Sequence, residues 1–162
     1  FFLIHIIQGL VLEIQNRSKR KVGYAIKMGE KGSKWYSRAM GILGSLILIF
    51  LIIHIIDFWI PSRFGGLTEV IIDGKPYHNL YAEMQYKFGE FEYRHAIVIV
   101  YLLGVISLFW HLVHGFQSAF RTLGLTNHKY ISMMTGLGWA FSLIVCLAFI
   151  MMPLSFLFGW IS

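Results

Sequence analysis

The chain has 162 residues, of which 57% are hydrophobic and 14% are charged, and its mean hydropathy is +0.65. Its apolar residues lie in long blocks, and blocks of about 18 or more apolar residues are typical of membrane spans. The net charge of +6 falls between these blocks, so it indicates membrane topology and not nucleic-acid binding. We therefore predict an all-α integral membrane protein built as a single helix bundle.

Four transmembrane helices are predicted, at about 1–16, 37–60, 94–121 and 131–160. The second is expected to end at Pro61, because proline disrupts helices. Residues 17–36 and 122–130 are predicted as inner loops, and residues 61–93 as an aromatic outer loop with turns at Gly65-Gly66 and Asp73-Gly74. The chain opens at Phe1 inside an apolar block, so at least one further turn, or a whole first span, is expected ahead of it.

Charge assigns the two sides of the membrane. Between Arg17 and Arg38 there are eight basic residues and one acidic residue, whereas between Asp57 and Arg94 there are four basic and six acidic residues. Basic loops stay on the cytoplasmic side. The loop 17–38 is therefore predicted to be cytoplasmic, and the loop 61–93 is predicted to lie outside.

Four of the seven histidines lie inside predicted spans: His5, His54, His111 and His114. A lone histidine in a bundle is usually structural, but an ionisable residue at membrane depth is a functional-site hypothesis. His5 lies twelve residues before Arg17 and His111 ten before Arg121, which places both roughly 15–18 Å from the inner boundary. Two level imidazoles on two helices suit the axial ligands of a b-type haem.

Glycine follows each of these two histidines by four residues, as Gly9 and Gly115. Residues four apart share a helix face, so each missing side chain leaves room for a porphyrin edge. Gly104, Ser107 and Ser118 continue a stripe of small residues around His111. Such a stripe also serves close helix packing, and the sequence leaves both explanations open.

His111 and His114 differ in their neighbours. His114 is followed at helical spacing by Gln117, Ser118 and Arg121. We therefore predict that His111 is the iron ligand and that His114 is a polar neighbour, with Arg121 a candidate partner for a haem propionate or a docked subunit. A zinc site is disfavoured because no dense Cys/His cluster occurs. A proton relay through His54 and Asp57, three residues apart, stays open.

The sequence resembles the cytochrome b membrane anchor of succinate:quinone oxidoreductases, the complex II and fumarate reductase group, in its single-anchor, two-haem, Bacteroidetes-like form. The resemblance is carried by His5-Ile-Ile-Gln-Gly9-Leu, by Gly41 to His54 with Phe58-Trp59, and by His111-Leu-Val-His-Gly-Phe-Gln-Ser-Ala-Phe-Arg-Thr-Leu-Gly124. It covers nearly the whole chain.

The resemblance implies five spans, the first lying ahead of this sequence, and two b haems in the respiratory chain. His5 and His111 would hold the haem nearer the cytoplasm, and His54 would be one ligand of the outer haem. It also implies a flavoprotein and an iron–sulfur subunit as partners, with a quinone, expected to be menaquinone, as substrate. Some members carry an intramembrane glutamate where this chain has Phe109, so their proton route is not expected here.

Four residues near the outer haem are candidates for a quinone pocket: Asp57, Trp59, Arg63 and Tyr81. Two other functions stay open. One is the di-haem cytochrome b of a hydrogenase or formate dehydrogenase. The other is a cofactor-free proton channel or transporter that uses His54, Asp57 and His111.

Overall fold

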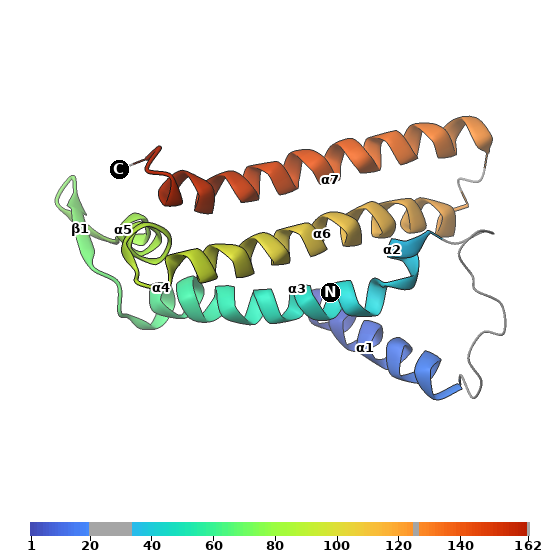
Figure 1. The fold of residues 1–162 in the computed structure, drawn as a ribbon, viewed down its shortest axis with the longest axis horizontal. Helices are drawn as coiled ribbons and strands as arrows, with labels where there is room; N and C mark the ends of the chain where they lie inside the picture. Colours follow the sequence, from blue (N-terminus) through green and yellow to red (C-terminus); the bar gives the residue numbers. More distant parts are fainter. Residues whose placement is uncertain (20–33, 125–126, 162) are drawn as a thin grey trace.

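Three helical segments are long and apolar enough to cross a membrane: Met40–Phe64, Arg94–Thr122 and Tyr130–Leu157. They lie roughly side by side along the long axis of the molecule (Figure 1). The computed structural model describes residues 1–19, 34–124 and 127–161. Helices pair every backbone group internally, which is what a hydrocarbon environment requires. The described chain thus has the make-up of an all-α membrane protein.

The first of these segments joins α3 (Met40–His54), the π-helix η1 (Ile55–Trp59) and α4 (Ile60–Phe64). The prediction that Pro61 ends this helix is wrong, because the helix continues to Phe64. Pro61 lies at the start of α4, where the amide hydrogen that proline lacks costs little. The helix ends instead at Gly65, whose φ of 93° suits glycine.

The other two segments belong to α6 (Arg94–Thr122) and α7 (His128–Leu157). Their bounds differ from the predicted spans by at most three residues. A Cβ on Gly138 of α7 would lie 2.8 Å from the Phe116 ring of α6, so this glycine allows the two helices to approach closely.

The N-terminal block forms α1 (Phe2–Lys19). This helix is not among the three that qualify as spans, because Glu13, Arg17 and Lys19 add charge to it. It has no buried residue and crosses α3 at an angle (Figure 1). A Cβ on Gly41 would collide with the Glu13 carboxylate, so Gly41 lies at a close contact between α1 and α3.

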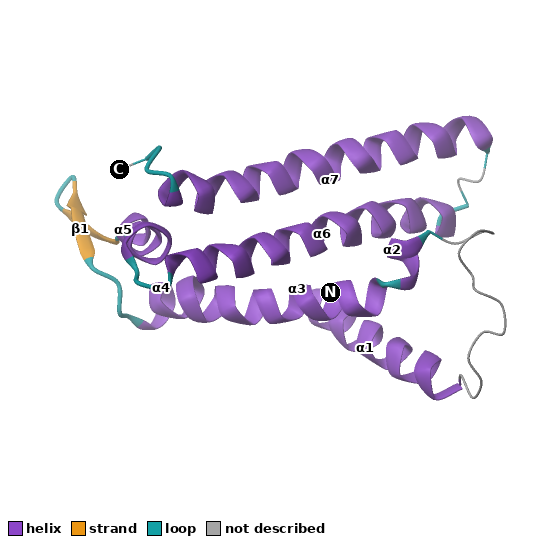
Figure 2. Ribbon diagram, in the orientation of Figure 1, coloured by secondary structure: helices purple, strands orange, loops and turns teal. Residues whose placement is uncertain are grey.

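The predicted outer loop contains regular structure (Figure 2). Strands β1 (Glu69–Ile72) and β2 (Lys75–His78) form an antiparallel hairpin, followed by α5 (Leu80–Gln85) and the π-helix η2 (Tyr86–Glu90). The predicted turn at Asp73-Gly74 is confirmed, since both residues have positive φ, as a tight hairpin turn requires. We call this end of the bundle the hairpin end.

The opposite end of the bundle, which we call the α2 end, holds the short helix α2 (Trp35–Arg38). Each end has its own buried cluster. Phe88, Val98, Tyr101 and Phe156 form the cluster at the hairpin end, and Tyr36, Leu43 and Val113 form the one at the α2 end. Residues 20–33, which include most of the predicted basic loop, and residues 125–126 lie outside the described part of the chain.

Candidate functional site

The structure brings His5 of α1 and His111 of α6 together. Their ring centroids are 6.0 Å apart and their planes cross at 81°. The two residues are 106 positions apart in the sequence, yet equal depth in two predicted spans was enough to expect this proximity. His5 is exposed and His111 is half-buried, so the pair opens to the side of the bundle where α1 lies.

His111 has a ring nitrogen that the described chain leaves unpaired. Its Nδ1 is buried and has no hydrogen-bond partner among the described residues. On the α3 side, a Cβ added to Gly44 would lie 3.6 Å from Cε1 of His111, so the imidazole packs against bare backbone. A buried polar atom without a partner costs about 1–3 kcal/mol, and this one lies on the side of the ring that packs against α3.

The spacing of the two rings fits one metal ion between them. A metal–imidazole nitrogen bond is about 2.0–2.1 Å long, and a ring nitrogen lies about 1.1 Å from the ring centre, so coaxial imidazoles on one metal have centres roughly 6 Å apart. A haem iron needs only two ligands from the protein, because the porphyrin supplies the other four. The centroid distance between His5 and His111 therefore matches the spacing of two axial haem ligands.

The small-residue stripe of α6 serves two purposes. A Cβ on Gly104 would collide with the Phe50 ring of α3, so this glycine serves helix packing. A Cβ on Gly115 would meet nothing within 4 Å, and the same holds for Gly9 on α1. The glycines that follow the two histidines thus face open space, as room for a porphyrin edge requires, whereas Ser107 is buried among protein.

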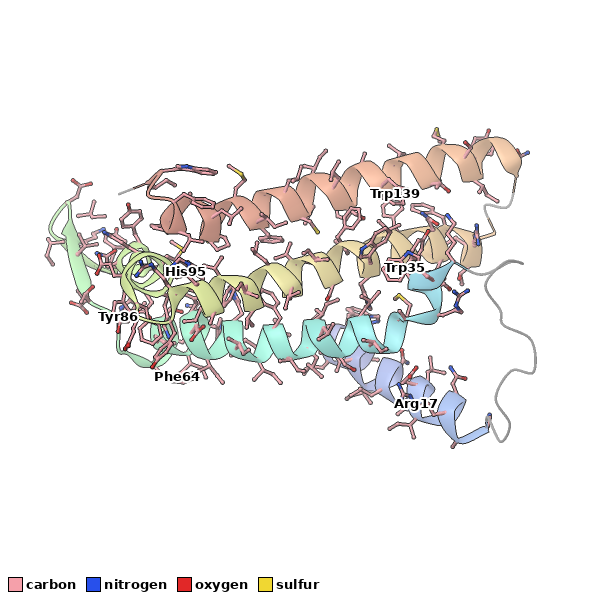
Figure 3. The ribbon with its side chains drawn as sticks, in the orientation of Figure 1. Arg17, Trp35, Phe64, Tyr86, His95 and Trp139 are labelled. Carbon is pink, nitrogen blue, oxygen red and sulfur yellow. The ribbon has the colours of Figure 1, made fainter. Side chains whose placement is uncertain are left out.

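His114 lies in different surroundings from His111. Its ring lies against that of Tyr36 on α2, with the ring centroids 6.3 Å apart. Tyr36 in turn stacks on Trp110, with a centroid distance of 5.2 Å. Trp110 also contacts Trp35 and Trp139, the two tryptophans labelled at the α2 end of the bundle in Figure 3. No described ring contact joins His114 to His5, so the histidine that meets His5 is His111.

His54 lies nearer the hairpin end, on α3, where the π-helix η1 begins. Its exposed side chain contacts the rings of Phe50, Phe58 and Tyr101 at 5.4–6.1 Å. Within the described ranges, no second histidine ring contacts it. The structure therefore gives His54 an aromatic setting and one open side.

Asp57, on η1, is held by two residues that the sequence did not single out. Lys87 Nζ of η2 donates to its Oδ1 at 3.0 Å, and the Tyr101 hydroxyl of α6 donates to its Oδ2 at 3.0 Å. We call Asp57, Lys87 and Tyr101 the carboxylate cluster. Both π-helices contribute to it, and π-helical turns often occur at functional sites. The available signal was a lysine, Lys87, placed directly between two aromatic residues in the predicted outer loop.

The four quinone candidates do not form one pocket. Asp57 is engaged within the carboxylate cluster, whereas Tyr81 contacts Phe156 of α7. Trp59 is half-exposed against Phe64, and Arg63 is exposed. No described contact joins Arg63 or Tyr81 to Asp57.

Arg121 lies in the last turn of α6, and it lines a hollow with residues of α7. It is ten residues from His111, which is about 15 Å along the helix. The pairing of Arg121 with a haem propionate or with a docked subunit stays a prediction. Gln117, one turn earlier, lines the same hollow.

Two observations complete the description of the site. Across the described residues, no group of three or more His, Cys, Asp or Glu side chains could hold a metal ion. Comparisons of the chain with protein-family profiles, with curated proteins and with solved structures found no match. The function must therefore be argued from the histidines and the surroundings that the fold gives them.

Proposed function

We propose that the chain is the haem b-carrying membrane anchor of a succinate:quinone oxidoreductase, which passes electrons between an iron–sulfur subunit and membrane quinone. The observation that carries the proposal is the His5–His111 pair, with ring centroids 6.0 Å apart. The sequence motifs around both histidines, which resemble those of the complex II anchors, support the same function.

In this proposal α1 is a fourth span beside α3, α6 and α7. The positive-inside bias puts the α2 end in the cytoplasm, because Lys34 and Arg38 of the basic stretch 17–38 lie there, and it puts the hairpin end outside. A flavoprotein and an iron–sulfur subunit dock at the α2 end. Succinate chemistry takes place on those subunits, and the anchor serves electron transfer in a bacterial inner membrane.

When bound, haem supplies reversible one-electron transfer at its iron. His5 and His111 hold the iron from two helices, and the open faces of Gly9 and Gly115 make room for the macrocycle. His54 would be one ligand of a second haem, as the resemblance to the complex II anchors implies. The apolar helices exclude water from both sites and so help to set the haem potentials.

A visible difference spectrum tests cofactor and electron donor together. In membranes that contain the protein, addition of succinate is expected to produce the α-band of a reduced b-type haem, and dithionite is expected to add the remaining haem signal. Malonate, which blocks succinate oxidation, should abolish the first signal and leave the second. Absence of an α-band with either reductant would refute haem binding and favour a cofactor-free protein.

Co-purification distinguishes a complex II anchor from the alternative, the di-haem cytochrome b of another respiratory complex. A complex II anchor is expected to purify with a subunit that carries covalent flavin. Haem with no flavin subunit would retain the haem assignment and reject the succinate reaction. For the proton-relay alternative, both carboxylate oxygens of Asp57 accept from Lys87 and Tyr101, and no described hydrogen bond joins Asp57 to His54.

A further inference from the structure

Helix α1 contacts the rest of the bundle through a charged residue. Within this helix, Ile6 and Glu13 are partly buried and every other residue is exposed. The two lie seven residues apart, which is two helical turns, so they mark one contact face. Ionisable residues in membrane spans face the bundle and have partners, and Glu13 does both. A carboxylate therefore supplies one of the two points at which α1 packs.

The Glu13 carboxylate lies directly against the backbone of α3. A Cβ built on Gly41 would come within 2.6 Å of Glu13 Oε2 and 2.8 Å of Oε1. Position 41 therefore has no room for a side chain while the carboxylate stays there. Arg17, labelled on α1 in Figure 3, donates from Nε to Glu13 Oε1 at 2.6 Å. The charge of Glu13 is thus balanced within α1, and its shape fits against α3.

The same short segment of α3 meets both helices that carry the histidine pair. Gly41 lies against Glu13 of α1. Gly44 lies against His111 of α6, whose Cε1 is 3.6 Å from the position of a Cβ on that glycine. The two glycines are three residues apart, which is about 4.5 Å along the helix axis. This segment of α3 therefore fixes the position of α1 relative to His111.

We propose that Glu13 is a positioning residue, which sets the crossing of α1 on α3 at Gly41 and thereby holds His5 opposite His111. The inference rests on the proposed function, in which those two histidines hold one iron. Glu13 and His5 are eight residues apart, about 12 Å along α1, so a tilt of about 10° at the crossing moves His5 by about 2 Å. A metal–imidazole bond is about 2.0–2.1 Å long, so a small tilt separates the ligands.

The distance between α1 and α7 tests the proposal by a readout that needs no haem. Spin labels are attached at Leu3→Cys on α1 and Ile144→Cys on α7, two exposed positions, in a protein that also carries Cys146→Ala. Double electron–electron resonance on the purified full chain in lipid nanodiscs then gives the distribution of label-to-label distances.

Both sides of the contact are changed in turn. Glu13→Ala removes the carboxylate, and Gly41→Leu fills its place. Leucine is used because a flexible carboxylate can swing aside for a single methyl group. Each variant should shift or broaden the distance distribution by at least about 2 Å, whereas Glu13→Gln, which keeps the shape of the side chain, should leave it unchanged. The variant with both changes should differ no more than the larger single change, because both act on one contact.

Two matched controls separate this contact from general loosening of the helices. Leu12→Ala truncates the neighbouring residue of α1, whose side chain is exposed. Gly136→Leu adds a leucine where a Cβ would have no neighbour within 4 Å. Neither should move the distribution. The thermal midpoint of each variant checks folding, and if Gly41→Leu fails to fold, the two Glu13 variants decide.

Two results would overturn the proposal: an unchanged distribution in both Glu13→Ala and Gly41→Leu, or an equal change in Leu12→Ala. Where haem is bound, the EPR spectrum of the ferric iron reports the relative orientation of the two axial imidazoles. It should change in Glu13→Ala and be retained in Glu13→Gln. Absence of haem from the unmodified protein would reject the proposed function, whereas the label distances decide independently whether Glu13 sets the position of α1.

Discussion

The two histidine regions of this protein are surrounded very differently. At His111 a second imidazole, His5, lies opposite, and the buried Nδ1 has no partner in the described chain. At His54 three aromatic rings are in contact, and the carboxylate cluster lies one helical turn away. The surroundings of a histidine inside a bundle are thus informative: a second imidazole lies opposite His111, whereas His54 lies among aromatic rings.

The largest expected effect separates His111 from its neighbour. His111→Ala should abolish one haem, because it removes a proposed axial ligand whose ring contacts that of His5. His114→Ala should retain both haems, since its ring contacts Tyr36 instead. Haem per protein, measured as the pyridine haemochrome, checks both variants. Loss of haem in His114→Ala alone would make His114 the iron ligand and His111 the polar neighbour.

His54→Ala should remove the other haem and leave the spectrum of the first unchanged. The reason is distance along the bundle, since His54 lies near the hairpin end, and no described contact joins it to His5 or His111. A redox titration should then show a single component where the unmodified protein shows two. Two remaining components would reject His54 as a ligand.

The carboxylate cluster should stabilise the hairpin end independently of any cofactor. Asp57→Asn is expected to lower the free energy of unfolding by about 1.5–3 kcal/mol, the range for hydrogen bonds to charged groups. Lys87→Met should cost a similar amount, and the double variant should cost less than the sum of the two. Additive losses in a thermal or chemical denaturation series would show that the ion pair contributes nothing.

The smallest expected effects separate packing glycines from cofactor glycines. Gly104→Ala should destabilise the bundle by about 1–3 kcal/mol through overpacking, because the new Cβ would collide with Phe50. In Gly115→Ala the new Cβ would have no neighbour within 4 Å, so the stability of the protein should be unchanged or slightly raised. The bulkier Gly115→Phe should lower haem content without unfolding the protein, and unchanged haem content would contradict the proposed room for the porphyrin.

Much of the helical framework could be predicted from hydropathy. The long apolar runs gave the helices of the bundle to within a few residues, except at Pro61, where the π-helix before it lets the helix continue. The hairpin turn was visible in Asp73-Gly74, but strands of four residues such as Glu69–Ile72 carry too short a pattern to stand out.

The site was predictable only where depth alone decides proximity. Counting residues from the basic ends placed His5 and His111 level, and their rings do meet. The partners of Asp57 could not be predicted from the sequence, because Lys87 and Tyr101 are 30 and 44 positions away. No sequence pattern links residues this far apart on different helices. The position of Arg121 depends on how α7 packs against α6, which no local pattern encodes.

The central claim, that His5 and His111 share one iron, is tested most directly by haem content in a double-variant series. His5→Ala, His111→Ala and the variant that carries both changes are purified, and haem per protein is measured for each. If the two histidines hold the same iron, each single variant loses one haem and the double variant loses no more. Loss of two haems in the double variant, or retention of full haem in either single variant, would contradict the account.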